Sequence, residues 1–281
     1  MKKWYLFALL GLAACSNNTT EEYIPQENEL VEVSLSFPQF TITQEEMPTR
    51  ATANVSTVAT HLDVWLIEGE NTIELNQATG DEGFGSISLT LDKTKTYTLY
   101  AIAHKGSAAA TLSDGIITFP DNKVTHSFWY TTTFSPGTTT ALSCTMNRIV
   151  GQFKLETADE VPIEVTKFRF SIPQTFTAWS TTGIGANKTD RVSEINLASR
   201  NQDGTATFNV FIIGSSEQEL YDITVAALNS NNEIVKSHIL EDVPIKNNYR
   251  TTARGIFFTD EDVNMSMSID DSWNEFDQYE Y

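Results

Sequence analysis

The sequence has little cysteine, little histidine and few basic residues: 2 cysteines, 4 histidines and 18 lysines plus arginines in 281 residues. Two cysteines cannot build a disulfide framework or a zinc site made mainly of thiolates. The basic residues face 37 aspartates and glutamates, which gives a formal net charge of -19. Because binding to a phosphate backbone needs clustered lysines and arginines, this charge excludes nucleic acid as a partner.

Sequence motifs of common enzymes are also missing. The chain contains no HExxH, GxSxG, Walker-type or GxGxxG pattern. His61, His104, His126 and His238 are far apart in the sequence, and we interpret them as ordinary surface or strand residues. The acidic run Asp260-Glu261-Asp262 lacks the alternating spacing and the glycine of an EF-hand loop. We therefore expect no metal, no cofactor and no enzyme activity, and the abundant carboxylates leave a glycosidase pair as an alternative.

The amino terminus has the features of an export signal. Two lysines follow the initiator methionine, and an apolar run extends from Trp4 to Leu12, which is too short to span a bilayer. The ending Leu12-Ala13-Ala14-Cys15 resembles the bacterial lipobox, although a plain signal peptide with an incidental cysteine is the alternative. We predict a signal peptide over residues 1–14, lipidation of Cys15 by acyl chains such as palmitate, and a polar tether over residues 15–29.

The rest of the chain reads as strands. Apolar residues alternate with small, hydroxylated or charged ones, a pattern typical of strands with one buried face. The alternating runs cover residues 31–37, 62–66, 87–91, 97–103, 168–172, 208–212, 221–227 and 265–269. No segment keeps a helical period over several turns, and turn residues separate the runs. This spacing predicts an all-β protein made of two tandem β-sandwich domains.

The division between the two sandwiches is expected near residue 147. A loop containing Ser135-Pro136-Gly137 precedes a last strand, in which Cys144 is interpreted as a buried apolar residue. The predicted domains are therefore residues 30–147 and 148–281. Within the second domain, Asp203-Gly204 is a good candidate for a two-residue hairpin turn.

Short motifs accompany the lipobox in a recognisable order. Met47-Pro48-Thr49-Arg50-Ala51 precedes His61-Leu62-Asp63-Val64-Trp65-Leu66, and Met146-Asn147-Arg148-Ile149-Val150-Gly151-Gln152-Phe153 opens the second half. With its acidic, tryptophan-bearing tail, the chain resembles the fimbrillin superfamily of Bacteroidales, the lipoprotein precursors of type V pili. The resemblance covers essentially the whole chain and implies two domains of the transthyretin-like β-sandwich type.

The resemblance also implies assembly by strand exchange, in which a protease cuts after an arginine and the first strand leaves its groove. The bond that matches here is Arg50–Ala51, the departing strand runs from Leu30 to Phe37, and the donor strand runs from Val263 to about Tyr281. The protein would be a structural subunit of a surface pilus or fimbria, with other pilin subunits as partners and adhesion as its role. Stalk, tip and outer-membrane lipoprotein anchor roles all fit the resemblance.

The residues themselves make such an exchange physically reasonable. Two segments carry the same four-residue alternation, so one could substitute for the other in a groove. They are Val31, Val33, Leu35 and Phe37 in the first segment and Val263, Met265, Met267 and Ile269 in the second. In the alternative interpretations, the second segment is simply the last strand of its own sandwich and Arg50 is an ordinary loop residue. A glycan-binding surface lipoprotein that stacks sugars on Trp179 or Trp273 is the alternative function.

Overall fold

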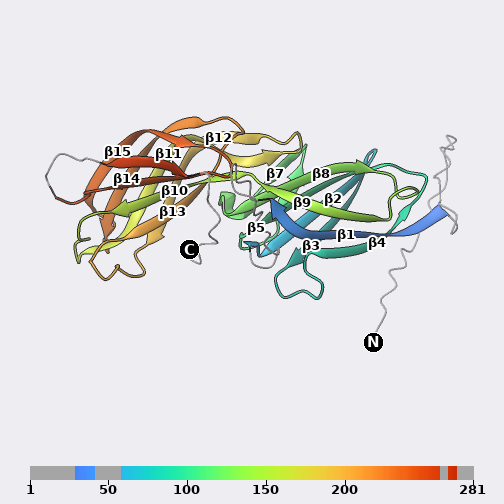
Figure 1. Ribbon diagram of the computed structural model, residues 1–281, viewed down its shortest axis with the longest axis horizontal. Helices are drawn as coiled ribbons and strands as arrows, with labels where there is room; N and C mark the ends of the chain where they lie inside the picture. Colours follow the sequence, from blue (N-terminus) through green and yellow to red (C-terminus); the bar gives the residue numbers. More distant parts are fainter. Residues whose placement is uncertain (1–28, 42–57, 260–264, 271–281) are drawn as a thin grey trace, which may run out of the picture.

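The alternating segments form β-strands in the computed structural model, which describes residues 29–41, 58–259 and 265–270. The strands belong to two sheets that follow one another along the long axis of the molecule (Figure 1). Each sheet folds over its own apolar side chains, so the protein consists of two β-sandwiches. The predicted all-β fold class is confirmed.

The first sandwich is built from one seven-stranded sheet with the order β3-β2-β5-β8-β9-β1-β4. Its strands are β1 (Leu30–Thr41), β2 (His61–Glu68), β3 (Asn71–Ala78), β4 (Ser86–Asp92), β5 (Tyr97–His104), β8 (Ser127–Phe134) and β9 (Ala141–Arg148). Strands β8 and β9 pair only through Phe128 with Arg148 and Trp129 with Asn147, and there the sheet turns from one layer into the other. The layers β3-β2-β5-β8 and β9-β1-β4 enclose a common apolar core.

The second sandwich contains the second sheet, whose ten strands include a hairpin from the first half of the chain. Its strands are β6 (Thr111–Ser113), β7 (Ile116–Thr118), β10 (Val150–Thr157), β11 (Val165–Ser180), β12 (Gly185–Asn196), β13 (Thr207–Ile213), β14 (Glu219–Asn229), β15 (Ile234–Ile245), β16 (Arg250–Gly255) and β17 (Ser266–Asp270). One layer is β15-β14-β11-β12 and the other is β13-β10-β16-β17. A single residue pair, Phe176 with Ile213, links β11 to β13 across the turn between the layers.

The two sandwiches are joined by more than the chain between them. Only Ile149 separates β9 from β10. The β6–β7 hairpin, whose turn residues Asp114 and Gly115 both have positive φ, pairs its second strand with the end of β11. A third apolar cluster then fills the junction, with Trp65 and Trp129 from the first sandwich and Trp179 from the second. The junction is therefore a small packed core of its own.

One local prediction is wrong. Gly204 does lie in a turn with positive φ, but the strands on either side of that turn, β12 and β13, do not pair with each other. β12 pairs with β11 in one layer and β13 pairs with β10 in the other.

The short helix η2 (Pro120–Asn122) lies in the long connection between β7 and β8. Within the described ranges, no helix has the length and hydrophobicity of a membrane span.

Candidate functional site

The first strand is an interior strand of the first sandwich. β1 pairs antiparallel with β4 from Leu30 to Ser36 and parallel with β9 from Ser34 to Thr41, with an irregularity between Ser36 and Gln39. Among the described strands, β1 is the sole partner of β4. Removing β1 would therefore separate β4 from its sheet and leave unpaired backbone groups along β9, which is the kind of edge that pairs with another chain.

The side chains of β1 complete the apolar core of that sandwich. Val33, Leu35 and Phe37 are each at most 1% exposed, and Val31 packs partly buried against the same core cluster. Burying one such side chain contributes about 1.5–3 kcal/mol, so the three fully buried ones contribute roughly 5–9 kcal/mol. The four residues predicted to leave with the first strand thus share one face, and that face fills a groove between β4 and β9.

The last strand occupies a different position. β17 lies at the edge of the second sheet and pairs antiparallel with β16 alone among the described strands. Met265, just before it, packs partly buried against the second core, whereas Met267 and Ile269 are 44% and 46% exposed. In this chain the segment is therefore the last strand of its own sandwich, and it buries little there. Val263, the remaining predicted donor residue, lies outside the described residues, as do Cys15, Arg50 and Ala51.

Cys144 lies on β9, next to β1, and the prediction that it is a buried apolar residue is confirmed. Its side chain is fully buried in the first core together with Leu35 and Phe37. Burial raises the pKa of the Cys144 thiol to about 12, with a hydrogen bond from Tyr130 acting in the opposite direction. The thiol is thus protonated and inaccessible as long as the core is closed.

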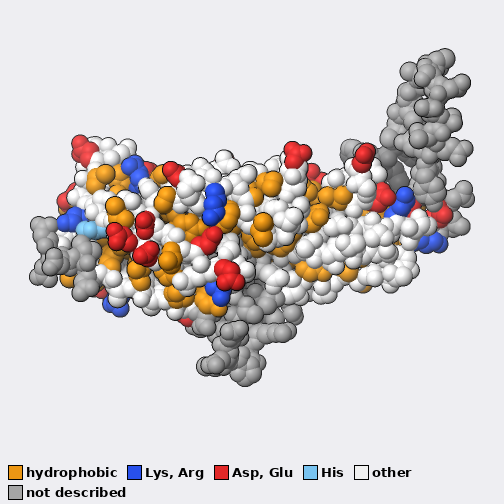
Figure 2. All heavy atoms as spheres, turned by 90° about the horizontal axis from the view of Figure 1, so that it is seen from above, with side chains coloured by type: hydrophobic (Ala, Val, Ile, Leu, Met, Phe, Trp, Pro, Cys, Tyr) orange, Lys and Arg blue, Asp and Glu red, His pale blue; other side chains and the backbone are white. Residues whose placement is uncertain are grey.

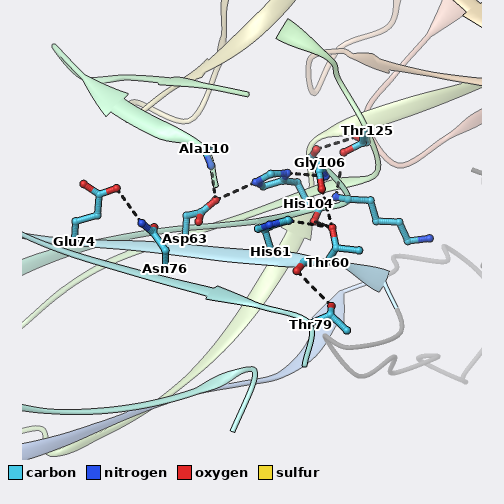
Figure 3. A network of polar contacts seen from close by, with 12 residues as sticks. Thr60, His61, Asp63, Glu74, Asn76, Thr79, His104, Gly106, Ala110 and Thr125 are labelled. Carbon is cyan, nitrogen blue, oxygen red and sulfur yellow. Dashed lines mark hydrogen bonds and ion pairs between the residues drawn. The ribbon is translucent and has the colours of Figure 1, made fainter. Parts of the chain in front are cut away.

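The structure brings two histidines together that are far apart in the sequence (Figure 3). The rings of His61 and His104 stack with centroids 5.5 Å apart. The backbone N–H of Gly106 donates to Nδ1 of His104 at 2.9 Å, so the other ring nitrogen, Nε2, carries the proton and donates to Oδ2 of Asp63 at 3.0 Å. The N–H of Ala110 donates to the same carboxylate oxygen at 2.8 Å.

The pair formed by His104 and Asp63 has a structural role. His104 and Asp63 have no exposed side-chain surface, so a substrate has no access to them. They fasten β2 to β5, and Thr60 adds a hydrogen bond from its hydroxyl to the carbonyl of Gly106 at 3.0 Å. The interpretation of the four histidines as surface or strand residues is wrong for His126, which is buried outside any strand. His104 is a buried strand residue.

Sequence spacing gave no signal for this pair, because His104 and Asp63 meet only through the pairing of β2 with β5. In the part of the chain that the structure describes, no three residues of the types histidine, cysteine, aspartate and glutamate are placed to hold a metal ion. Trp179, considered as a sugar-stacking residue, is 4% exposed and belongs to the junction core. It offers no open aromatic platform.

The surface of the second sandwich carries more exposed apolar side chains than that of the first. Figure 2 shows hydrophobic side chains spread between acidic and basic ones over the second sandwich, on the left. Except for Leu30, the large hydrophobic residues that are exposed in the described ranges all belong to the second half of the chain. They are Ile163, Ile184, Val192, Leu220, Ile234, Ile239, Met267 and Ile269.

Comparison by sequence matches residues 120–280 to the model of a protein family described as a family of unknown function, DUF6562. The matched segment covers more than half of the chain and extends from helix η2 through β17. No curated protein matches the sequence.

Comparison by structure finds proteins with the same fold. A candidate adhesin from Bacteroides ovatus has a TM-score of 0.54 and 12% identity, with 84% of this chain and 96% of that chain covered. A candidate adhesin from Bacteroides thetaiotaomicron has a TM-score of 0.50 and 11% identity, with 85% and 95% covered. A fimbrial anchor protein from Porphyromonas gingivalis has a TM-score of 0.47 and 10% identity, with 85% and 96% covered. At these identities, the first two establish similarity of fold.

Proposed function

The chain belongs to the DUF6562 family, and we propose that it is a cell-surface fimbrial or adhesive subunit that assembles by exchange of its first strand. The proposal follows the resemblance to fimbrillins, and it fits the description of the structurally similar Bacteroides proteins as candidate adhesins. The position of β1 between β4 and β9 is the single observation that carries it. That strand completes the first sandwich and precedes every other strand of the described residues.

Cleavage at Arg50–Ala51 would break the covalent connection between β1 and the rest of the molecule. β1 ends at Thr41 and β2 begins at His61, so this bond lies in the segment that connects them. After cleavage, only hydrogen bonds and core contacts would retain β1. Because the proposed lipid site at Cys15 precedes β1, the same cleavage would also release the body from its membrane anchor.

The vacated groove needs an occupant with alternating apolar side chains. Residues 263–269 have that pattern, and β17 gives up little when it leaves its own sheet, because Met267 and Ile269 are nearly half exposed. The backbone of an incoming strand would restore the partner of β4, and its apolar side chains would fill the pockets of Val33, Leu35 and Phe37. Methionine adapts well to a groove shaped by another side chain.

The contact would be head-to-tail, since the groove belongs to the first sandwich and the donor to the second. Repetition of a heterologous contact that does not close on itself generates an open fibre. An anchor subunit would keep β1 and end the fibre at the membrane, whereas a stalk or tip subunit would lose β1.

The experiment is limited digestion of the purified full chain with trypsin, followed by size-exclusion chromatography and amino-terminal sequencing. We expect a new amino terminus at Ala51 and the appearance of polymers. An Arg50→Ala variant should stay intact and monomeric. A variant that lacks residues 263–281 should be cut but should not polymerise. If the chain is cut after Arg50 and β1 dissociates, yet the protein stays monomeric, then exchange assembly is wrong.

A further inference from the structure

A cleft of about 710 Å³ lies at the junction of the two sandwiches, along the open side of the second one. It exists because β12 and β13 belong to different layers and do not pair. Residues 191–195 of β12 and 209–211 of β13 form its walls on one side, and residues 121–125 with Thr60 and Lys105 close it from the first sandwich. A cavity of this size is within the range of roughly 300–1,000 Å³ that small-molecule sites occupy.

Arg191 of β12 occupies a position whose partner on β11 is a buried apolar residue. Arg191 pairs with Ile172, and residues opposite each other in an antiparallel pair share a face of the sheet. Ile172 is buried in the second core, so Arg191 also points between the layers. Its guanidinium donates to the carbonyl of Phe211 at 2.6 Å and to the carbonyl of Val124 at 3.5 Å. Arg191 therefore touches both β13 and the connection from the first sandwich.

No carboxylate of the described residues forms an ion pair with Arg191; the two carbonyls are its hydrogen-bond partners there. Burial alone lowers the pKa of Arg191 to about 10, which still leaves it charged at neutral pH. A guanidinium has five N–H donors, and two carbonyls do not occupy them all. A partly buried cation without a countercharge is unfavourable, so this arginine favours an anion in the cleft.

The other charged residues of the cleft are two lysines and two carboxylates. Lys105 and Lys123 also line it, against the carboxylates of Asp121 and Glu194. Glu194 is already engaged by Lys167 at 2.6 Å and by an Arg169 nitrogen at 2.7 Å on the outer face of the sheet. The lining thus carries three basic residues, Arg191 included, and two acidic ones, in a chain with a net charge of -19.

The neutral part of the lining fits hydroxyl groups. Asn209 lines this wall with a side-chain amide whose Oδ1 is buried and accepts no hydrogen bond in the structure. The hydroxyl-bearing side chain of Ser193 faces the same side of β12 as Arg191, because the two are separated by one residue. Val124 and Phe211 add apolar residues to the lining.

From this geometry, we propose that the cleft is a binding site for a small acidic saccharide whose carboxylate pairs with Arg191. A planar guanidinium edge matches a carboxylate with two parallel hydrogen bonds. The ring hydroxyls would hydrogen-bond with the hydroxyl of Ser193, and the apolar face of the sugar would lie against the apolar lining. This site lies outside the β1 groove, so it does not depend on strand exchange.

The cleft is also held in shape without a ligand. The hydroxyl of Thr125 accepts a hydrogen bond from the backbone N–H of Lys105 at 3.1 Å, which ties the two loops of the first sandwich together (Figure 3). A Cβ at Gly106 would come within 2.6 Å of the His104 ring, so the loop passes close to the buried histidine. The His104–Asp63 pair thereby supports the wall that carries Lys105.

The test is isothermal titration of the full chain with glucuronate and N-acetylneuraminate, with glucose as the neutral control. We expect binding of at least one acidic sugar and none of glucose. Arg191→Gln should weaken that binding by about 10- to 100-fold, the usual effect of losing a charge-assisted hydrogen bond, and Arg191→Lys should weaken it less. Arg254→Gln, a change at an exposed arginine of the same sandwich, should leave the affinity unchanged.

Asn209→Asp provides a second variant in case loss of Arg191 impairs folding. It places a negative charge in the cleft with almost no change of shape, and it should abolish binding of the acidic sugars while the circular dichroism spectrum stays the same. The proposal would be overturned if no acidic sugar binds at millimolar concentration, if glucose binds as well as the acidic sugars, or if Asn209→Asp binds the acidic sugars normally. Binding of glucose 6-phosphate without binding of the carboxylated sugars would also contradict it.

Discussion

Two strands with the same alternating pattern have opposite positions in this protein. β1 is an interior strand whose core-facing side chains are almost completely buried, whereas β17 is an edge strand whose apolar side chains are nearly half exposed. Period-two alternation identified both as strands, because it reports which side chains share a face. It did not report how many neighbours each strand has. That difference, which determines what the loss of each strand would do, is a property of the sheet and not of the segment.

The largest expected effect separates these two strands directly. Leu35→Ala removes a 1% exposed side chain from the first core and should lower the free energy of unfolding by about 2–5 kcal/mol. Ile269→Ala removes a side chain of the same composition as that of Leu35, but one that is 46% exposed. This change should lower the free energy of unfolding by less than about 1 kcal/mol. Urea denaturation of both variants, monitored by tryptophan fluorescence, measures the two values. Equal losses would mean that β17 is as firmly held as β1.

A smaller effect on stability is expected at the junction between the first sandwich, which contains β1, and the second, which contains β17. His126 is buried there, with its ring stacked on Phe211 of β13 at a centroid distance of 5.2 Å. Burial lowers the pKa of His126 well below its ordinary value of 6.5, and the charges of Arg148 and Lys105 act in the same direction. After β1 has left, the packing at this junction would still have to keep the second sandwich attached to the first.

The sign of the pH effect follows from the lowered pKa. Below about pH 6.5 the unfolded chain takes up a proton at His126 and the folded chain does not, so acid removes stability that is fully present above that pH. The loss approaches about 1.4 kcal/mol for each pH unit below 6.5. Thermal unfolding from pH 7.5 to 5 should therefore show a steeper decline for the natural chain than for His126→Phe. Parallel curves would show that the pKa of His126 is not lowered in the folded state.

The sequence predicted the fold class well, because each alternating segment carries its own signal. The runs that include Leu35, Leu89, Phe170 and Val225 are all strands with a buried face. The burial of Cys144 was predicted in the same way, since its neighbours Leu142 and Met146 share its parity on β9.

What failed depended on contacts between distant segments. The expected hairpin at Asp203-Gly204 has the right turn residues, but β12 and β13 continue into opposite layers, because β12 extends along β11. That failure has a consequence for function, since the open side between these strands contains the cleft with Arg191. The pairing of His104 with Asp63 and the docking of the β6–β7 hairpin on β11 are likewise set by sheet register. No local pattern encodes them.

The displacement of β1 is tested most directly by the reactivity of Cys144, which becomes the only thiol when Cys15 is changed to alanine. In the intact Cys15→Ala chain, Cys144 should not react with a thiol reagent at pH 8. After cleavage at Arg50 and release of β1, the thiol should react rapidly, and a synthetic peptide of residues 263–281 should protect it again. A thiol that stays protected after cleavage, or that reacts and is not protected again by the peptide, would contradict exchange of β1.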